Sequence, residues 1–503
     1  MSRPEQWDPR GTLSGGPSLY EFALEVGRRP PGRRAPGRLP GGAPRPSRRT
    51  NTAADTTSRM VATAAYLTRS GPDHLALSVL DGQLRRIVWG DHERSLEAGL
   101  RRRGLPSDRL RLLGGWFATR GEHPNAVRFG ILLLGTAGHD GDSGVLKTLG
   151  ILWEFSAQAC DALVRSGTDP HRALFELARQ AEGWARVDAV RGLVDASDPE
   201  ITLWLVRDSC TGDTLDSYLA LTAARTGDLA GILARDTLDE ETLDGAGRLI
   251  EALTDIDGPG PALAWYDDAL RALEGCLVHF TAGALTLRRL WTLLSVHRFL
   301  HSSDANTTCR KSHGWQRIRH RVAAVVHDPA SREIVLLGLT AEDRSVFRLA
   351  AWTARLTDIP VRPALLRRVE SEPDNASAWT MLADDCTGEE IEAVVAAAAR
   401  LLPLRELRSG PTTETGLGRG YDTDGILGLV VSRLDQHPGH GWELVETALG
   451  NRTCRNRRTA LRVLSSWPTG CVPSTARHAL LTAAAREPLP ELAEAMAREA
   501  RRL

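Results

Sequence analysis

The sequence contains almost no lysine, because Lys147 and Lys311 are the only two among 63 basic residues and all the others are arginines. Alanine, glycine, leucine and aspartate are abundant beside this arginine bias. The combination is typical of a GC-rich bacterial genome. Because it reflects codon usage, it predicts no function that is specific to arginine.

Long hydrophobic runs are also lacking. No apolar stretch approaches the roughly 20 residues that a membrane-spanning helix needs, and the N-terminus has no continuous apolar core of a signal peptide. The seven cysteines are odd in number, widely spaced and without a C-x-x-C pair, which is typical of reduced thiols. We therefore expect a cytoplasmic protein without a membrane partner.

An excess of charge of either sign is absent over the whole chain, whose formal net charge is zero. Residues 1–59 hold 11 arginines and 5 acidic residues, so the remainder carries an acidic excess. Binding to a phosphate backbone needs a basic surface, and we therefore do not expect nucleic acid as a partner. The 42% hydrophobic and 25% charged residues are typical of a folded protein.

The N-terminal segment differs from the rest in composition. Residues 27–50 contain 6 prolines, 5 glycines and 8 arginines, which disfavour helices and repel one another. We predict a disordered basic tail over residues 1–59. It is either a solvated extension, with Met60 as the true start, or a tail that contacts an acidic partner.

From residue 60 the pattern predicts one helix after another. Asp198-Pro199, Asp328-Pro329, Asp169-Pro170 and His123-Pro124 each place a side-chain acceptor before a proline, which is the signature of a helix start. Apolar residues at helical spacing follow these starts. The stripes are Ile201, Trp204 and Leu205; Val127, Ile131 and Leu134; Val346, Leu349, Ala350 and Ala354; and Ala460, Leu461, Leu464 and Trp467.

So many short helices joined by short turns predict an all-α fold, an α-α superhelix of the HEAT or armadillo type. We expect a solenoid over residues 60–405, a flexible loop over 406–424 and further repeats of the same solenoid over 425–503. We expect a second exposed loop over residues 302–316. One Asp81-Gly82 pair indicates a short hairpin, the only strand signal.

Residues 110 to 290 resemble a family of poorly characterised bacterial proteins with HEAT-like repeats, some of which carry the label limonene hydroxylase. The label implies an oxygen-activating enzyme, but no catalytic motif can be transferred to this chain. Ile151-Leu152-Trp153 stands where the family often has charged residues, so this member would lack the activity if those charges matter. The resemblance is carried by Leu149-Gly150, Glu154-Phe155, Gly183-Trp184-Ala185-Arg186-Val187, Pro199-Glu200-Ile201, Trp204-Leu205, Tyr218-Leu219-Ala220, Gly227-Asp228-Leu229 and Gly258-Pro259.

The best candidate for chemistry is a group of histidines and one cysteine. His297 and His301 are four residues apart and share a helical face, and Cys309 and His313 could complete a tetrahedral zinc site. The spacing is loose and no acidic ligand accompanies it. We therefore predict solvated histidines and no metal site.

Two glycine-bearing segments resemble known loops only superficially. Gly416, Gly418 and Gly420 lack the preceding strand that a dinucleotide loop requires. Asp140 and Asp142 could begin a calcium loop, but its later ligands are missing, so Asp142 is expected to begin a helix. No cofactor site is predicted from either segment.

Thirteen tryptophans against five tyrosines indicate aromatic packing between repeats, with a ligand groove as the alternative. Trp184, Trp204, Trp352 and Trp467 lie in or beside apolar stripes. The arginines Arg128, Arg186, Arg348 and Arg462 are expected on the surface or in pairs between helices.

The sequence therefore favours a non-catalytic helical-repeat scaffold that binds another protein. A hydroxylase-type enzyme, as the family label implies, is one alternative. A DNA-binding HEAT-like protein is the other. No catalytic residue and no cofactor is predicted.

Overall fold

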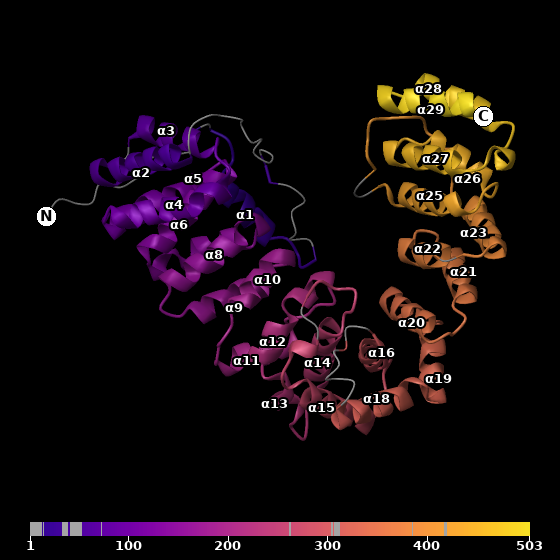
Figure 1. Cartoon of the computed structure of the whole chain (residues 1–503), viewed down its shortest axis with the longest axis horizontal. Coiled ribbons are helices and arrows are strands. Elements are labelled where there is room, and N and C mark those ends of the chain that lie inside the picture. Colours follow the sequence, from indigo (N-terminus) through magenta and orange to yellow (C-terminus); the bar gives the residue numbers. More distant parts are fainter. Residues whose placement is uncertain are drawn as a thin grey trace. The chain divides into compact units, whose positions relative to one another are not determined.

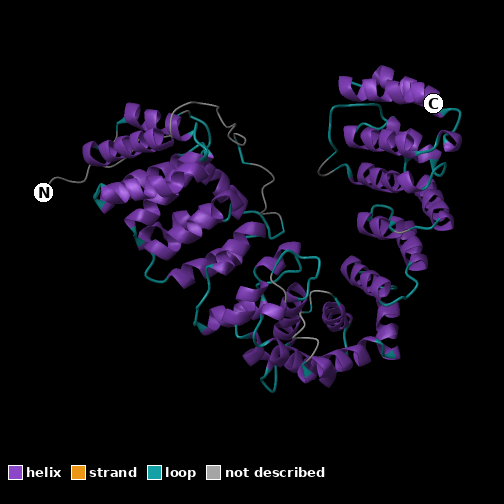
Figure 2. Ribbon diagram, viewed as in Figure 1, coloured by secondary structure: helices purple, strands orange, loops and turns teal. Residues whose placement is uncertain are grey.

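A computed structural model describes residues 13, 15–32, 39–40, 53–71, 73–260, 263–302, 305, 312–384, 386–416 and 420–503. Within these ranges the regular secondary structure is helical throughout, and no strand is present (Figure 2). The prediction of an all-α fold is confirmed. None of the helices in these ranges is both long and apolar enough to cross a membrane.

The chain divides into two compact units, Met1–Val326 and His327–Leu503 (Figure 1). Each unit is built from α-helices joined by short turns. The described α-helices of the first unit are α1 (Leu19–Gly27), α2 (Ala53–Ser70), α3 (His74–Leu84), α4 (Trp89–Arg102), α5 (Ser107–Arg120), α6 (Pro124–Ala137), α7 (Ser143–Gly150), α8 (Trp153–Ser166), α9 (Pro170–Gln180), α10 (Gly183–Arg191), α11 (Pro199–Arg207), α12 (Ala220–Thr226), α13 (Leu229–Leu233), α14 (Glu240–Leu253), α15 (Ala269–Ala282), α16 (Leu287–His301) and α18 (His313–Val326). Those of the second unit are α19 (Pro329–Gly338), α20 (Arg344–Leu356), α21 (Arg362–Ser371), α22 (Ala376–Ala383), α23 (Gly388–Leu401), α24 (Leu404–Leu407), α25 (Asp422–Arg433), α26 (Trp442–Leu449), α27 (Cys454–Ser466), α28 (Ala476–Arg486) and α29 (Pro490–Arg502).

Successive helix pairs stack in two layers within the first unit. Helices α2, α4, α6, α8 and α10 lie side by side in chain order, and α5, α7 and α9 pack against α6, α8 and α10. A single helix pair cannot bury its apolar face alone, so each helix pair packs against the next one. This is the superhelical stacking of an α-solenoid.

The second unit repeats this arrangement. Helices α22, α25, α27 and α29 form one layer, and α21, α23, α26 and α28 form the other. Helix α19 packs on α20, and α28 packs on α29 as the last pair. Each helix therefore contacts its sequence neighbours and the next pair in the stack.

The four predicted helix starts are confirmed. Asp169, Asp198 and Asp328 each accept a backbone N–H of the first turn, and proline follows each one. His123 does the same through Nδ1, which accepts the N–H of Asn125 at 3.2 Å. These caps fix where α6, α9, α11 and α19 begin, because proline presets the backbone angle of the first helical residue.

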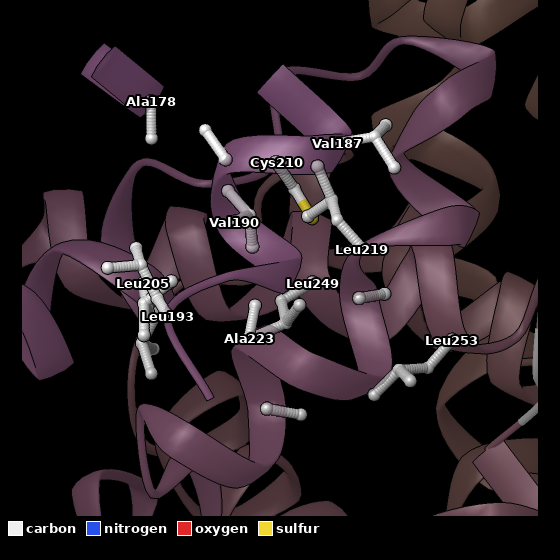
Figure 3. Packing of buried hydrophobic residues seen from close by; sticks show 14 of the residues in the cluster. Ala178, Val187, Val190, Leu193, Leu205, Cys210, Leu219, Ala223, Leu249 and Leu253 are labelled. Atoms are coloured by element: carbon white, nitrogen blue, oxygen red, sulfur yellow. The ribbon is translucent and has the colours of Figure 1, made fainter. Parts of the chain in front are cut away.

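The core of the first unit runs between the layers. Figure 3 shows Val187 and Val190 of α10, Leu205 of α11 and Leu249 of α14, which belong to one cluster of buried side chains. Each such side chain contributes about 1.5–3 kcal/mol when it leaves water. The stack is therefore stabilised mainly by apolar contacts between consecutive pairs.

Arginine side chains recur at helix C-termini, where the last carbonyls lack helical partners. Arg186 of α10 donates to the carbonyls of Asp208 and Ser209, which follow α11. Arg248 of α14 donates to the carbonyl of Arg207 at the same end, at 2.9 Å. Four further arginines contact a helix end in this way; they are Arg319, Arg362, Arg457 and Arg502. Arginine thus links neighbouring pairs as well as covering the surface.

The predicted tail over residues 1–59 is wrong for two stretches, because residues 53–59 belong to α2 and residues 19–27 form a helix of their own. That helix, α1, packs on α5 and α7 and buries Leu19, Ala23 and Val26. A capping box between Ser18 and Glu21 begins this helix. Most of the proline-rich segment over residues 27–50 lies outside the described residues.

The predicted hairpin at Asp81-Gly82 is also wrong. The pair lies inside α3, whose Leu77, Leu80 and Leu84 are buried at helical spacing. Asp81 forms an ion pair with Arg85 one turn later, at 2.6 Å. Burial of the apolar stripe outweighs the turn preference of the Asp-Gly pair.

Parts of the two predicted loops are helical. Helix α18 begins at His313, inside the loop expected over residues 302–316, and α24 and α25 occupy both ends of 406–424. Residues 410–416 are irregular but held in place, because the N–H groups of Gly410 and Thr412 donate to Gly450 and Arg452, each at 3.0 Å. The N–H of Cys454 donates back to Glu414 at 2.8 Å.

Candidate functional site

The surface of α9, α10 and α11 carries an open groove of about 410 Å³. It is lined by Phe175, Arg179, Arg186, Glu200, Leu203, Trp204, Arg207 and Asp208, which we call the Arg179 groove. Its volume lies in the range that peptide side chains or small ligands fill. Its charged lining consists of three arginines and the carboxylates of Glu200 and Asp208.

The helix starts of α9 and α11 place these residues. Because α9 begins at Pro170, Phe175 and Arg179 fall one turn apart on the same face. Trp204 lies near the C-terminal end of α11, beside the buried Leu205 that anchors this helix. The groove therefore depends on the packing of two consecutive helix pairs.

Two aromatic rings form its floor. The rings of Phe175 and Trp204 meet edge to face at 77°, with centroids 5.4 Å apart. Phe175 is 1% exposed and Trp204 is 9% exposed, so the rings are nearly covered by the protein. Such pairs are stabilising beyond their buried area and hold their geometry.

Arginines stack on this floor. The guanidinium carbons of Arg172 and Arg179 lie 5.2 Å and 5.5 Å from the Phe175 ring centre. That of Arg186 lies 5.4 Å from the Trp204 ring centre. A guanidinium over a ring face keeps its N–H edge available for an anion.

The arginines differ in what else they contact. Arg172 pairs with Glu200 at 2.6 Å, and this hydrogen bond holds the pKa of Arg172 above its usual range. Arg207 pairs with Asp208 at 3.0 Å. Burial lowers the pKa of Arg186, whose N–H groups bind two carbonyls. Arginine stays charged despite such a shift.

Arg179 has no such partner. Its side chain is exposed at the end of α9, and no carboxylate of the described residues lies within ion-pair distance of it. Its guanidinium lies over the Phe175 ring. It is therefore a preset donor for a carboxylate that another molecule supplies.

Trp184 of α10 forms a second aromatic pair. Trp184 and Tyr218 stack at 4.5 Å between ring centres, with 53° between their planes. Trp184 remains 39% exposed.

Of the four residues considered as metal ligands, the structure shows two in contact. His297 and His301 stack with ring centres 4.3 Å apart, and Nδ1 of His301 hydrogen-bonds the His297 carbonyl at 2.8 Å. Cys309 lies outside the described residues, and His313 begins α18. In the ranges that the structure covers, no group of three potential ligands could hold a metal ion.

The two glycine-bearing segments take structural roles where they are described. Gly416 adopts a left-handed φ of 76°, and Gly418 lies outside the described residues. Asp142 stands at the N-cap of α7 as expected, but its carboxylate pairs with Arg111 at 2.7 Å. Asp140 accepts the N–H of Thr168 at 2.6 Å.

The tryptophans divide into two groups. Trp204 and Trp467 are buried, so the interpretation as packing residues holds for them. Trp184 and Trp352 are 39% and 40% exposed.

Four arginines were expected on the surface or in pairs between helices. Arg348 and Arg462 are exposed, whereas Arg128 and Arg186 bind neighbouring helices.

Sequence reasoning missed Arg172, Phe175 and Arg179. Their spacing of three and four residues was visible and places them on one face of a helix. Nothing in the sequence indicated that Arg186 of α10 and Trp204 of α11 would line the same groove. The groove becomes apparent only when α9, α10 and α11 are packed together.

A second basic surface lies on α27 in the other unit. Arg455, Arg458 and Arg462 line an open cavity of about 440 Å³ together with Thr415 and Thr459. All three arginines are exposed, and none has a carboxylate partner in the part of the chain that the structure describes. They form one arginine row along the helix face.

Comparison with protein-family models and with curated proteins gave no match for this chain. The resemblance to the HEAT-like family stays a prediction from the residues quoted above.

Proposed function

We propose that this chain is a helical-repeat scaffold that binds a partner protein through the Arg179 groove. The partner would supply an exposed segment with a carboxylate next to an aromatic or aliphatic side chain. The observation that carries the proposal is Arg179, a charged group stacked on Phe175 without a carboxylate partner among the described residues.

The chemistry of the groove supports this choice. Arginine and tryptophan are the residues that most often dominate binding energy at protein interfaces. A guanidinium held flat by a ring loses little conformational entropy when a carboxylate arrives. Repeat stacks present such surfaces over several consecutive helices, which suits an extended segment.

The test uses the full chain with one photo-crosslinking residue at Gln180, next to the groove. Partners crosslinked in native cytosol are identified, and the peptide of the partner that carries the crosslink is synthesised. Its affinity is then measured for the wild-type chain, Arg179→Gln and the control Arg103→Gln. Arg103 is another exposed arginine, at the end of α4, outside the groove.

We expect Arg179→Gln to weaken binding at least about tenfold, because a hydrogen bond to a charged group contributes about 1.5–3 kcal/mol. Replacement of the acidic residue in the peptide should have the same effect. Arg103→Gln should bind as the wild type does. Equal affinities for all three proteins would show that the groove is not the binding surface.

The arginine row on α27 favours a second candidate function, binding to a polyanion such as DNA. The observation is that Arg455, Arg458 and Arg462 face solvent on one helix side without paired carboxylates among the described residues. The test is a titration with duplex DNA at several salt concentrations. Neutralising all three arginines with glutamine should reduce the salt dependence of binding, whereas Arg179→Gln should not.

A further inference from the structure

The first unit contains another cavity, of about 450 Å³, at the N-terminal ends of α4, α6 and α8. Residues 87–90 at the start of α4 form one wall. Asn125 and Arg128 of α6 and Glu154 and Gln158 of α8 form the others. We call it the Trp89 cavity. It is separate from the Arg179 groove and shares no residue with it.

Asn125 connects the walls of this cavity through hydrogen bonds. It is fully buried, and its amide donates to the carbonyls of Leu84 at 2.9 Å and Ile87 at 3.0 Å. These bonds fasten the turn between α3 and α4 to α6. The Asn125 Oδ1 atom accepts from Nη1 of Arg128 at 3.3 Å, and Nη2 of Arg128 donates to the Glu154 carbonyl at 3.3 Å. Trp89, Arg128 and Glu154 are therefore held in fixed relation.

Three of the residues that line the cavity each have a buried polar atom without a hydrogen-bond partner among the described residues. These atoms are Nε1 of Trp89, Oε2 of Glu154 and Oε1 of Gln158. Trp89 is 6% exposed, so its indole N–H is removed from bulk water. Nε2 of Gln158 already donates to Glu93, which leaves Oε1 as its available atom.

Protein interiors pair nearly all of their buried polar groups, because an unpaired one is destabilising. A molecule that enters the cavity and hydrogen-bonds these three groups would therefore remove a destabilising contribution. The three groups offer one N–H donor and two oxygen acceptors. Arg128 adds N–H groups beyond the two that its long hydrogen bonds use.

The charged side chains in and near the cavity determine which charges a bound molecule should carry. Burial lowers the pKa of Arg128, and the nearby carboxylates of Glu93 and Glu154 oppose that shift. Burial raises the pKa of Glu154, which Arg128 opposes in turn. A simple anion in the cavity would meet the carboxylate of Glu154, and a simple cation would meet the guanidinium of Arg128. A molecule with both charges complements the cavity.

We propose that the Trp89 cavity binds a small zwitterion of the amino-acid type. Its carboxylate lies against Arg128 and the Trp89 indole N–H, near the N-terminal ends of three helices that favour negative charge. Its ammonium group lies against Glu154 Oε2 and Gln158 Oε1. The cavity volume falls in the range that small-molecule sites occupy.

The first experiment follows thermal unfolding of the full chain in the presence of each of the twenty standard amino acids. Butylamine and butyrate serve as probes that carry only one of the two charges. We expect at least one amino acid to raise the unfolding midpoint and neither single-charge probe to do so. The midpoint rises because the ligand binds only the folded chain.

The second experiment measures the affinity of that amino acid by calorimetry for the wild type and three variants. Trp89→Phe removes the indole N–H together with the five-membered part of the ring, and Glu154→Gln removes the negative charge of the carboxylate. Trp116→Phe is the matched control, since Nε1 of Trp116 is also buried without a partner among the described residues but does not line the cavity. We expect at least a tenfold loss of affinity for the first two variants and none for the control.

Two results would overturn the proposal. The first is that no amino acid shifts the midpoint or releases heat. The second is that Trp89→Phe and Glu154→Gln, both with wild-type helical circular dichroism, bind as tightly as the wild type. The two variants lie on different helices, so failure of one to fold leaves the other as a complete test. Neither result depends on the protein-binding groove.

Discussion

Arg457 and Glu487 form a two-bond ion pair in which the two side chains are 1% and 0% exposed. Nε donates to Oε2 at 2.6 Å and Nη2 donates to Oε1 at 2.8 Å. The same guanidinium donates to the carbonyls of Asn451, Arg452 and Thr412. One side chain of α27 therefore fastens the end of α26, the irregular segment before α25 and the turn that precedes α29.

Replacing Arg457 with methionine should destabilise the second unit by about 3–5 kcal/mol. The substitution leaves the Glu487 carboxylate buried without its charged partner and removes the donor from three carbonyls. The measurement is urea-induced unfolding followed by circular dichroism. Arg458→Met is the matched control, because Arg458 is the exposed neighbour. It should change stability by less than about 0.5 kcal/mol, and a similar loss for both variants would contradict this account.

Gly130→Ala should destabilise the first unit by about 1–3 kcal/mol. A Cβ atom at Gly130 of α6 would lie 2.3 Å from the backbone nitrogen of Ala118 in α5, and backbone atoms cannot rotate away. Gly115→Ala in α5 is the control, since a Cβ atom there meets nothing within 4 Å. It should stabilise the helix by about 0.5–1 kcal/mol. Thermal unfolding of both variants measures the difference, and equal effects would exclude close helix contact as the cause.

Glu251 should make stability depend on pH. Burial between α14 and α16 raises the pKa of its carboxyl from 4.5 to about 7, although Arg288 and Thr292 bind it. Between these values the folded chain holds a proton that the unfolded chain has released. The contribution of Glu251 to stability therefore falls as the pH rises through this window, by up to about 3 kcal/mol.

The measurement compares the wild type with Glu251→Gln at pH 5 and pH 8. Glutamine cannot ionise, so the variant should lose this part of the pH dependence while other groups contribute equally to both proteins. The stability of the wild type relative to the variant should decrease from pH 5 to pH 8. An unchanged difference would show that Glu251 titrates at its ordinary pKa.

Val26→Asp should release α1 from the first unit. Val26 is fully buried against α5 and α7, and a carboxylate there would have no charged partner. We expect the amides of residues 19–27 to exchange hydrogen at least about 100-fold faster, which corresponds to about 2.7 kcal/mol. Glu25→Gln is the control, because Glu25 is 70% exposed on its outer side. Unchanged exchange in Val26→Asp would mean that the docking of α1 does not protect it.

The missed helix α1 shows how local composition can hide a local signal. Ser18 and Glu21 have the spacing of a capping box, and Leu19, Ala23 and Val26 have the spacing of a buried face. These signals stand next to the arginine- and proline-rich segment, whose composition dominated the prediction for the whole of residues 1–59. In contrast, the Asp81-Gly82 pair favours a turn, but burial of the apolar residues of α3 keeps this pair inside the helix.

The sequence by itself determined the class of fold and the positions of many helix starts. Both follow from interactions between residues that are three or four positions apart, such as the cap at Asp198 and the stripe that contains Leu205. The tertiary structure decided which side chains of different helices meet. Arg179 contacts the ring beneath it locally, but Trp204 and Arg186 reach the same groove only because consecutive pairs stack. In the same way, Trp89, Glu154 and Gln158 line one cavity because three helices, whose first residues are 35 and 29 positions apart in the sequence, begin at the same edge of the stack.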